Sequence, residues 1–122
     1  MTIALVIDDN REMADSLCDI LKMLGLEAYP VYGSRTAIIA LSKKIPDVVF
    51  LDINMPGVSG FEVLSFMTRE PKLQDVPVFV ITSDDQPQTA EKARKTGALM
   101  TIVKPPTIDG LEVALKRVGL LT

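Results

Sequence analysis

Residues 48–52 read Val48-Val49-Phe50-Leu51-Asp52, an apolar run that ends in an acid. Three other apolar runs also end in polar or charged residues: 3–7 runs into Asp8-Asp9, 78–81 into Thr82-Ser83, and 102–103 into Lys104. Short runs of β-branched and aromatic residues are typical of buried parallel strands. Because ligands of open α/β sheets bind beyond the carboxyl ends of the strands, these runs predict one polar rim that can receive a ligand.

Helical patterns alternate with the predicted strands along the whole chain. Apolar residues recur at helical spacing in the segments 10–24, 34–45, 59–70, 86–96 and 107–118. Strands are expected at 3–7, 27–31, 47–52, 76–82 and 99–103. This regular alternation predicts an α/β fold, (βα)5, in which right-handed crossovers place helices on both faces of a doubly wound parallel sheet.

The predicted helices differ in how clearly their ends and inward faces are marked. Ser34 is expected to cap the second helix, whose inward face extends to Ile45. The last helix is expected to turn Ile108 inward. The fourth has a thin apolar face, chiefly Ala90 and Ala93. A helix with so little apolar area to bury is expected to be weakly held.

The composition is that of one soluble globular domain. With 122 residues, 48% hydrophobic and 24% charged, the chain is expected to form a single domain over residues 1–122. The net charge of −3 and the lack of a basic cluster argue against direct nucleic-acid binding. No apolar run is long enough to span a bilayer, and no signal-peptide pattern is present. The single cysteine, Cys18, is interpreted as a core residue, and a cytoplasmic location without a membrane partner is expected.

The acids at the predicted rim favour a hard divalent cation. In a parallel sheet Asp8, Asp9 and Asp52 are expected to lie within a few ångströms of one another, where like charges repel. Mg²⁺ relieves this repulsion and prefers oxygen ligands. The chain contains no histidine, which argues against zinc or copper. The Asp8-Asp9 pair is therefore the predicted metal holder.

The same rim also suits phosphoryl transfer. A carboxylate beside Mg²⁺ can attack phosphorus and form an aspartyl phosphate. Asp52 is the predicted nucleophile because it ends the predicted central strand. Lys104 supplies a positive charge and the Thr82 hydroxyl a hydrogen-bond donor for the phosphoryl oxygens.

Five motifs in order resemble the receiver domain of bacterial two-component response regulators, of the chemotaxis-regulator kind. They cover essentially the whole chain and are Asp8-Asp9, Asp52, Met55-Pro56-Gly57, Thr82-Ser83 and Lys104-Pro105. The resemblance implies a flavodoxin-like fold with strand order 2-1-3-4-5. It also implies a cis peptide bond between Lys104 and Pro105.

The resemblance further implies a role for each residue of the rim. Asp9, Asp52 and the backbone carbonyl of Asn54 would ligate Mg²⁺ directly, with Asp8 acting through a water. Asp52 would accept a phosphoryl group from a histidine kinase, a phosphotransfer protein or a small phosphodonor. Thr82 and Lys104 would bind the phosphoryl oxygens. A downstream output protein or domain would be the other partner, and a monomer or weak dimer is expected.

One departure from the family concerns how phosphorylation is read out. Three residues before the lysine, the family usually carries a Tyr or Phe, and here Thr101 stands in that position. The acids that often precede the aromatic are replaced by Leu99 and Met100. Phosphorylation and its readout are therefore separate questions for this chain.

The residues also suggest three alternatives to a phosphorylated receiver. The first is a degenerate receiver that acts as a phosphorylation-independent interaction module, which the missing aromatic motivates. The second, a phosphatase of the haloacid dehalogenase type, needs a second Asp where Asn54 stands. The third, a flavodoxin, needs a phosphate-binding loop where Asp8-Asp9 would repel an anion. The sequence favours a receiver that catalyses its own phosphorylation and dephosphorylation and is not a turnover enzyme.

Overall fold

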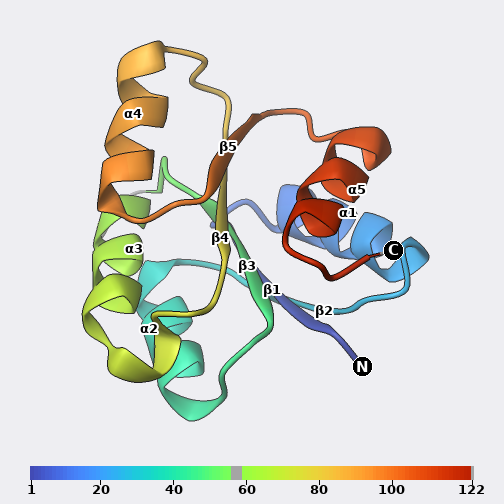
Figure 1. Cartoon of the computed structure of the whole chain (residues 1–122), viewed down its shortest axis with the longest axis horizontal. Coiled ribbons are helices and arrows are strands. Elements are labelled where there is room, and N and C mark those ends of the chain that lie inside the picture. Colours follow the sequence, from blue (N-terminus) through green and yellow to red (C-terminus); the bar gives the residue numbers. More distant parts are fainter. Residues whose placement is uncertain (56–58, 122) are drawn as a thin grey trace.

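The computed structural model describes residues 1–55 and 59–121, and these form one parallel sheet with helices on both faces (Figure 1). The strands are β1 (Ile3–Ile7), β2 (Glu27–Val31), β3 (Val48–Asp52), β4 (Val78–Thr82) and β5 (Met100–Val103). All pair in parallel, in the order β2-β1-β3-β4-β5. The predicted fold class and strand order are confirmed.

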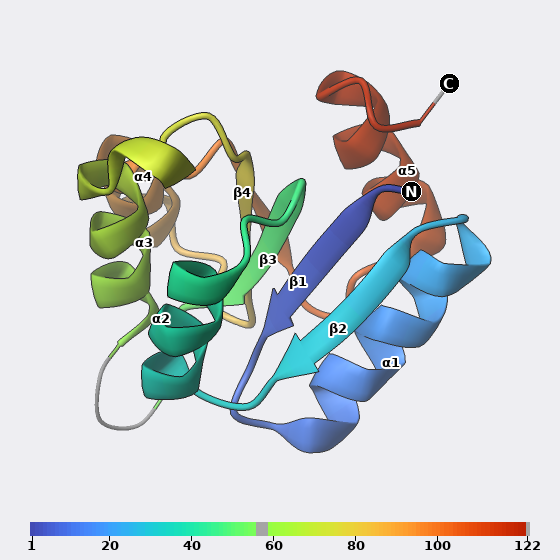
Figure 2. The same cartoon turned by 90° about the horizontal axis from the view of Figure 1, so that it is seen from below.

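The helices divide between the two faces of the sheet. They are α1 (Arg11–Met23), α2 (Ser34–Lys43), α3 (Gly60–Arg69), α4 (Pro87–Thr96) and α5 (Ile108–Arg117), with a short 3-10 turn at Pro71–Leu73. Figure 2 shows α2, α3 and α4 on one side of the sheet and α1 and α5 on the other. None of the helices in the described part of the chain is long and apolar enough to cross a membrane.

The central strands β3 and β4 carry the core. Every residue of both strands is buried. Their side chains alternate between the two faces, as the period of a strand requires, so that Val49 and Leu51 pack toward α2 and α3 while Phe50 packs toward α1 and α5. The rings of Phe50 and Phe79 stack with centroids 5.5 Å apart. Because these strands are packed on both faces, the residues at their carboxyl ends are held in fixed positions.

Two inward assignments made from the sequence are wrong. Ile45 is 49% exposed, because α2 ends at Lys43 and the chain turns to an extended conformation at Lys44. A residue before proline, as Ile45 is before Pro46, disfavours the helical conformation. Ile108 is 41% exposed, since it is the first residue of α5 and lies one turn before the buried Leu111.

The cap of α2 also differs from the prediction by one residue. The N-cap is Gly33, with φ +132°, and Ser34 is the first residue of the helix. A positive φ of this size is open to glycine and strained for other residues. The caps of α1 and α5 are Asn10 and Thr107, whose side chains accept hydrogen bonds from backbone N–H groups three residues on.

Candidate functional site

Four strands deliver the predicted rim residues to one end of the sheet. Asp52 and Thr82 are the last residues of β3 and β4, while Asp8 and Lys104 come directly after β1 and β5. Neighbouring strands end at the same level, since Ile7 pairs with Leu51, Asp52 with Ile81 and Thr82 with Val103. This in-register ending explains why residues up to 96 positions apart in the chain meet.

Three carboxylates form an acid cluster at this end. One oxygen atom from each of Asp8, Asp9 and Asp52 lies within 4.8 Å of the others. Asp8 is 6% and Asp52 5% exposed, whereas Asp9 faces solvent. Two buried acids and one exposed acid leave the cluster open on the side of Asp9.

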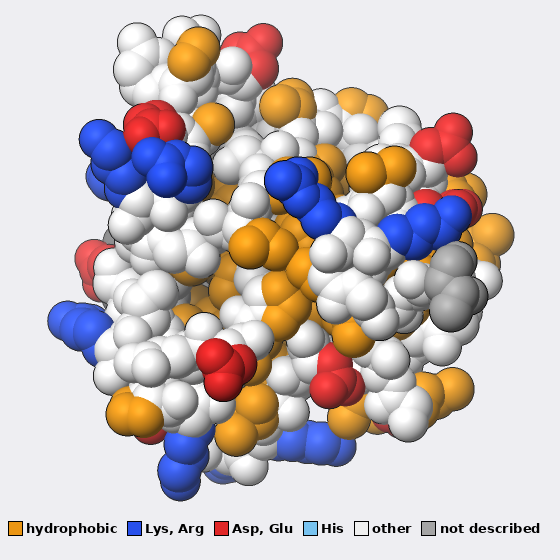
Figure 3. All heavy atoms as spheres, viewed as in Figure 1, with side chains coloured by type: hydrophobic (Ala, Val, Ile, Leu, Met, Phe, Trp, Pro, Cys, Tyr) orange, Lys and Arg blue, Asp and Glu red, His pale blue; other side chains and the backbone are white. Residues whose placement is uncertain are grey.

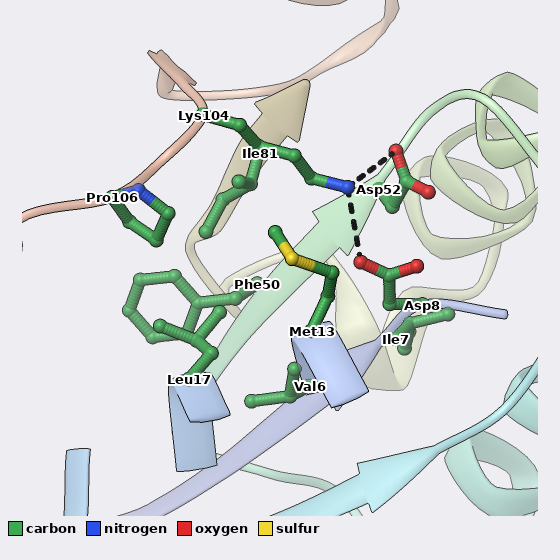
Figure 4. A pocket seen from close by; sticks show the side chains of 10 residues that line it. All are labelled: Val6, Ile7, Asp8, Met13, Leu17, Phe50, Asp52, Ile81, Lys104 and Pro106. Atoms are coloured by element: carbon green, nitrogen blue, oxygen red, sulfur yellow. Dashed lines mark hydrogen bonds and ion pairs between the residues drawn. The ribbon is translucent and has the colours of Figure 1, made fainter. Parts of the chain in front are cut away.

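The Lys104 ammonium lies between the two buried acids (Figure 4). Its Nζ is 3.1 Å from Asp8 Oδ2 and 3.7 Å from Asp52 Oδ1. Apolar side chains from α1 and the sheet close the floor beneath the three charged groups, among them Met13, Leu17 and Phe50. Low-dielectric surroundings of this kind strengthen the interaction of the charges with one another and with a ligand.

Burial raises the pKa of Asp52 to about 6. Burial is the largest cause of this net shift and the charge of Asp8 the second, while Lys104 and the hydrogen bond from the Asn54 backbone N–H lower the pKa. One ammonium thus compensates the acid pair only in part. The three carboxylates fit a hard cation such as Mg²⁺, which prefers oxygen ligands. Their combined negative charge is also larger than the single positive charge of Lys104.

Asn54 and Thr82 form a hydrogen-bonded extension of the cluster. The Asn54 backbone N–H donates to Asp52 Oδ1 at 3.1 Å, and the Asn54 side-chain amide donates to Thr82 Oγ1 at 3.2 Å. The Asp84 backbone N–H donates to the same Thr82 oxygen at 3.1 Å. Thr82 is fully buried, and because its oxygen accepts two hydrogen bonds, its own proton is available for donation.

The structure thus brings together most of the residues that the sequence selected. Asp8, Asp9, Asp52 and Lys104 form the cluster, and Asn54 links Asp52 to Thr82. The cis peptide bond between Lys104 and Pro105 is confirmed. The Met55-Pro56-Gly57 motif lies largely outside the described residues, which include only its buried Met55.

Two features of the site were not anticipated. Pro106 joins Met13 and Leu17 in the apolar lining, and Thr89 of α4 donates a hydrogen bond to Asp84 at 2.6 Å. The apolar lining depends on how α1 and the segment after β5 are placed against the sheet, which the sequence pattern does not show. The Thr89 bond joins residues five apart through a loop, and neither strand nor helix periodicity signals such a contact.

Thr101 is half-buried on β5, beside α4. Together with Ala90 and Leu99 it lines a shallow hollow of ≈ 340 Å³ between these two elements. In the space-filling view, hydrophobic side chains show over this edge of the sheet, between α4 and α5 (Figure 3). The side chain at position 101 on this hollow is thus a threonine and not an aromatic ring.

The basic side chains of α4 belong to a solvated helix face. Arg94 pairs with Glu91 at 2.7 Å, and Lys95 lies 3.8 Å from the same acid. Lys92 lies over the ring of Phe61 on α3, 4.2 Å from its centroid.

Cys18 is buried, and burial raises the pKa of its thiol to about 11.

Comparisons with known proteins agree with the fold. The chain is similar to the phosphate regulon transcriptional regulatory protein PhoB of Klebsiella pneumoniae, with 27% identity over 114 residues, and spans 50% of that relative's length. It is also similar to the structure of the chemotaxis protein CheY4 of Vibrio cholerae, with a TM-score of 0.90, 26% identity, and coverage of 97% of this chain and 98% of that one. The structure of NtrX from Brucella abortus matches with a TM-score of 0.87 and 29% identity over 97% of this chain and 27% of that one. Residues 4–116 match the family model of the response regulator receiver domain, and the chain therefore belongs to this family of two-component signalling domains.

Proposed function

We propose that the chain is a phosphoacceptor receiver domain, in which Asp52 takes a phosphoryl group from the phosphohistidine of a histidine kinase or phosphotransfer protein. The observation that carries this proposal is the Lys104 ammonium held between the buried Asp8 and Asp52, with the Thr82 hydroxyl on the next strand. In this proposal the three groups would serve as nucleophile, counter-charge and hydrogen-bond donor around one small space. The proposal covers residues 1–122 as one domain.

Asp52 is suited to attack on phosphorus. Its raised pKa of about 6 leaves it ionised at pH 7.5, while partial desolvation keeps it more basic than an exposed acid. A bond forms between a carboxylate oxygen and phosphorus as the P–N bond of the donor breaks. The electron pair of that bond returns to the imidazole, which takes up a proton. Because the carboxylate is held by the Asn54 N–H, little entropy is lost on reaching the reactive geometry.

Lys104 and Thr82 complete the charge balance around the phosphoryl group. The Lys104 ammonium, oriented by Asp8, neutralises charge on the phosphoryl oxygens. The Thr82 O–H donates to another of these oxygens without losing the two hydrogen bonds that it accepts. Water later attacks the same phosphorus, which releases inorganic phosphate and restores the Asp52 carboxylate.

Mg²⁺ is the proposed cofactor of this reaction. Asp8, Asp9 and Asp52, with the backbone carbonyl of Asn54, are the residues that would hold it. When bound, the cation supplies positive charge to the phosphoryl oxygens and relieves the repulsion among the acids.

The experiment uses phosphoramidate, whose P–N bond resembles that of phosphohistidine, and a phosphate-affinity gel. The parent protein should give a shifted band in Mg²⁺ and none in EDTA. Asp52→Asn should give no band, while Asp75→Asn, an exposed acid outside the cluster, should behave as the parent. A band that Asp52→Asn retains would refute Asp52 as the acceptor.

A degenerate receiver that binds partners without phosphorylation is the second candidate. Thr101, half-buried where the family usually carries an aromatic ring, favours it. The intact acid cluster favours the first candidate. Absence of a shifted band from the parent protein in Mg²⁺ would select this alternative.

The proposed setting is a cytoplasmic phosphorelay. A downstream output protein or domain would respond to phosphorylation, and the domain would act as a monomer or weak dimer. Because the chain spans half the length of the PhoB relatives, an output domain on the same polypeptide is one form that this partner can take.

A further inference from the structure

A hollow between the edge strand β2 and the helix α2 is separate from the acid cluster. Its volume is ≈ 430 Å³, and proteins bind small molecules in pockets of roughly 300–1,000 Å³. Pro46, which lines it, lies just before β3, whereas the acid cluster lies beyond the carboxyl ends of the strands. Its lining also includes Leu5, Val31, Ala40, Tyr29 and Lys44. The surface offered to a ligand is thus largely apolar, with one phenol and one ammonium.

The hollow exists because α2 turns a small side chain toward the edge of the sheet. Ala40 is the half-buried helix residue that lines it, whereas Ala37 and Leu41 are fully buried in the core. The helix ends just before Lys44, where the chain becomes extended. The outer part of β2 therefore stays uncovered, and Tyr29 is 44% exposed.

The backbone of β2 is poorly suited to receive a further strand, although β2 is an edge strand (Figure 2). The Glu27 N–H donates to the Thr2 carbonyl, and the Val31 carbonyl accepts from the Asp8 N–H, so these residues direct their backbone groups toward β1. The alternate residues direct theirs away from the sheet, and the central one of these is Pro30, which has no N–H. An occupant of this region is therefore held by the hollow more readily than by strand pairing.

Lys44 gives the hollow a positive charge that has no carboxylate partner. In the part of the chain that the structure describes, its ammonium forms no ion pair. Two acids of the surrounding segments have other partners: Glu27 accepts from the Tyr29 hydroxyl at 2.7 Å, and Asp47 accepts from the Ile3 backbone N–H at 2.7 Å. An anion at the hollow would thus find a cation whose charge is uncompensated.

The charge of α2 also distinguishes among possible occupants. The segment 34–45 contains Arg35, Lys43 and Lys44 and no acid, in a chain whose net charge is −3. A two-fold dimer through this face would bring two such basic helices together, which like charges oppose. An anionic ligand gains from the same charges. The face therefore favours an anionic, largely apolar occupant over a second copy of the chain.

We propose that the hollow between α2 and β2 binds a free carboxylic acid with a compact apolar body, whose carboxylate pairs with Lys44. The apolar body packs on Leu5, Val31 and Pro46. One ammonium balances one carboxylate, whereas a phosphate dianion would hold uncompensated charge over apolar surface, at a cost. This second site goes beyond the proposed phosphoryl transfer and does not rest on it.

The first test is an NMR titration of the parent protein with sodium octanoate and, separately, with octanol. Octanoate should give saturable shifts of the Leu5, Val31 and Ala40 methyl signals and leave Leu17 and Leu115, on the other face of the sheet, unchanged. A purely apolar patch prefers the uncharged octanol, whereas the proposed site should bind octanoate more tightly. Octanol binding more tightly, shifts on both faces, or no saturable shift would overturn the proposal.

The second test compares two neighbouring lysines. Lys44→Met keeps most of the side chain, removes the charge, and should weaken octanoate binding about threefold, as expected for one exposed ion pair. Octanol binding should not change. Lys43→Met is the matched control, because Lys43 is exposed and does not line the hollow, and it should bind octanoate as the parent does. Equal losses in the two variants would refute Lys44 as the partner of the carboxylate.

The third test fills the hollow. Ala40→Leu should weaken the binding of both probes at least about fivefold, because leucine would occupy the space in which the apolar body is buried. Ser42→Leu places the same side chain at an exposed position of α2 that does not line the hollow, and should bind as the parent. Undiminished binding to Ala40→Leu would overturn the site. A dimer that diffusion measurements detect in the parent and not in Ala40→Leu would show that a second copy is the occupant, and would also overturn it.

Discussion

The acid cluster and α4 are neighbours that are built in opposite ways. The cluster stands on β1, β3 and β4, in which every residue is buried except the partly exposed Ile3, and Asp8 and Asp52 are themselves 6% and 5% exposed. In α4, by contrast, Ala93 is the one described residue that is fully buried. The strands beneath the cluster are packed on both faces, whereas α4 packs against the rest of the domain through little buried area.

This difference separates chemistry from response within a small fold. Transfer of a phosphoryl group requires reactive groups in fixed positions, which buried strands provide. A change of conformation requires an element whose alternative positions differ little in free energy, and such elements come from the less stable parts of a protein. Substitutions in the two regions should therefore differ in the size of their effects on stability.

The largest effect is expected from Gly60→Ala at the base of the cluster. A Cβ on Gly60 would overlap the Asp52 carbonyl oxygen and lie 2.6 Å from Ile53 Cα, both of them backbone atoms that cannot turn aside. We expect a loss of more than about 3 kcal/mol in the free energy of unfolding, measured by urea denaturation.

Gly97→Ala at the end of α4 is the counterpart of this substitution. The overlap there is with a methyl group of Thr68, which can rotate, and the positive φ of +124° adds strain. A loss of about 2 kcal/mol is expected. If Gly97→Ala cost more than Gly60→Ala, the contrast between a rigid cluster and a lightly held helix would be wrong.

Lys104→Met should have the next largest effect, because it leaves Asp8 and Asp52 facing each other without a counter-charge. The Lys104 side chain is 18% exposed, so solvent screens part of the repulsion, and about 2–3 kcal/mol should be lost at pH 7.5. Mg²⁺ should restore part of this loss by replacing the missing charge.

Lys95→Met on α4 is the control for the charge. The Lys95 side chain is 69% exposed and lies 3.8 Å from Glu91, so its removal should change stability by less than about 0.5 kcal/mol. Equal losses for the two lysines, or no effect of Mg²⁺ on Lys104→Met, would contradict the electrostatic account of the cluster.

Asp52→Asn should stabilise the metal-free protein at pH 7.5, by about 2 kcal/mol. The pKa of Asp52 is raised to about 6 in the folded protein, above the value of 3.8 for an unperturbed carboxyl, so the folded state binds the proton more tightly. The parent should therefore lose stability as the pH rises from 4 to 6. The advantage of Asp52→Asn should shrink as the pH falls through this range.

Thermal unfolding in EDTA at pH 4.5 and 7.5 measures this difference. The stabilisation of Asp52→Asn should be smaller at the lower pH. A stabilisation that is equal at both values, or larger at pH 4.5, would show that the charge of Asp52 is not its source.

The sequence predicted the cluster better than it predicted the contacts of the helices and loops. Asp52 and Thr82 were placed correctly because a buried strand leaves a long apolar run, and parallel strands end together. Ile108 was misplaced, because helical spacing does not show where a helix extends beyond the sheet. The bond between Asp84 and Thr89 depends on the path of an irregular loop, for which the residues give no periodic signal.

The pKa of Asp52 shows a second kind of limit. The sequence indicated repulsion among the acids, but the main cause of the shift is burial, with Asp8 second. Burial depends on how closely α1 and the sheet pack around the carboxyl group. The spacing of acids in a sequence therefore predicts a charged site more readily than the electrostatic balance within it.

The smallest effect is expected where α4 meets α3. Lys92 lies over the Phe61 ring at 4.2 Å, and a cation–π contact at an exposed site contributes about 0.5 kcal/mol. Lys92→Met keeps the length of the side chain and removes the charge, so stability should fall by no more than this. Phe61→Leu, alone and with Lys92→Met, isolates the contact as a coupling free energy from urea denaturation. A coupling above about 1.5 kcal/mol would mean that α3 holds α4 firmly, and the contrast between a rigid cluster and a lightly held helix would then be wrong.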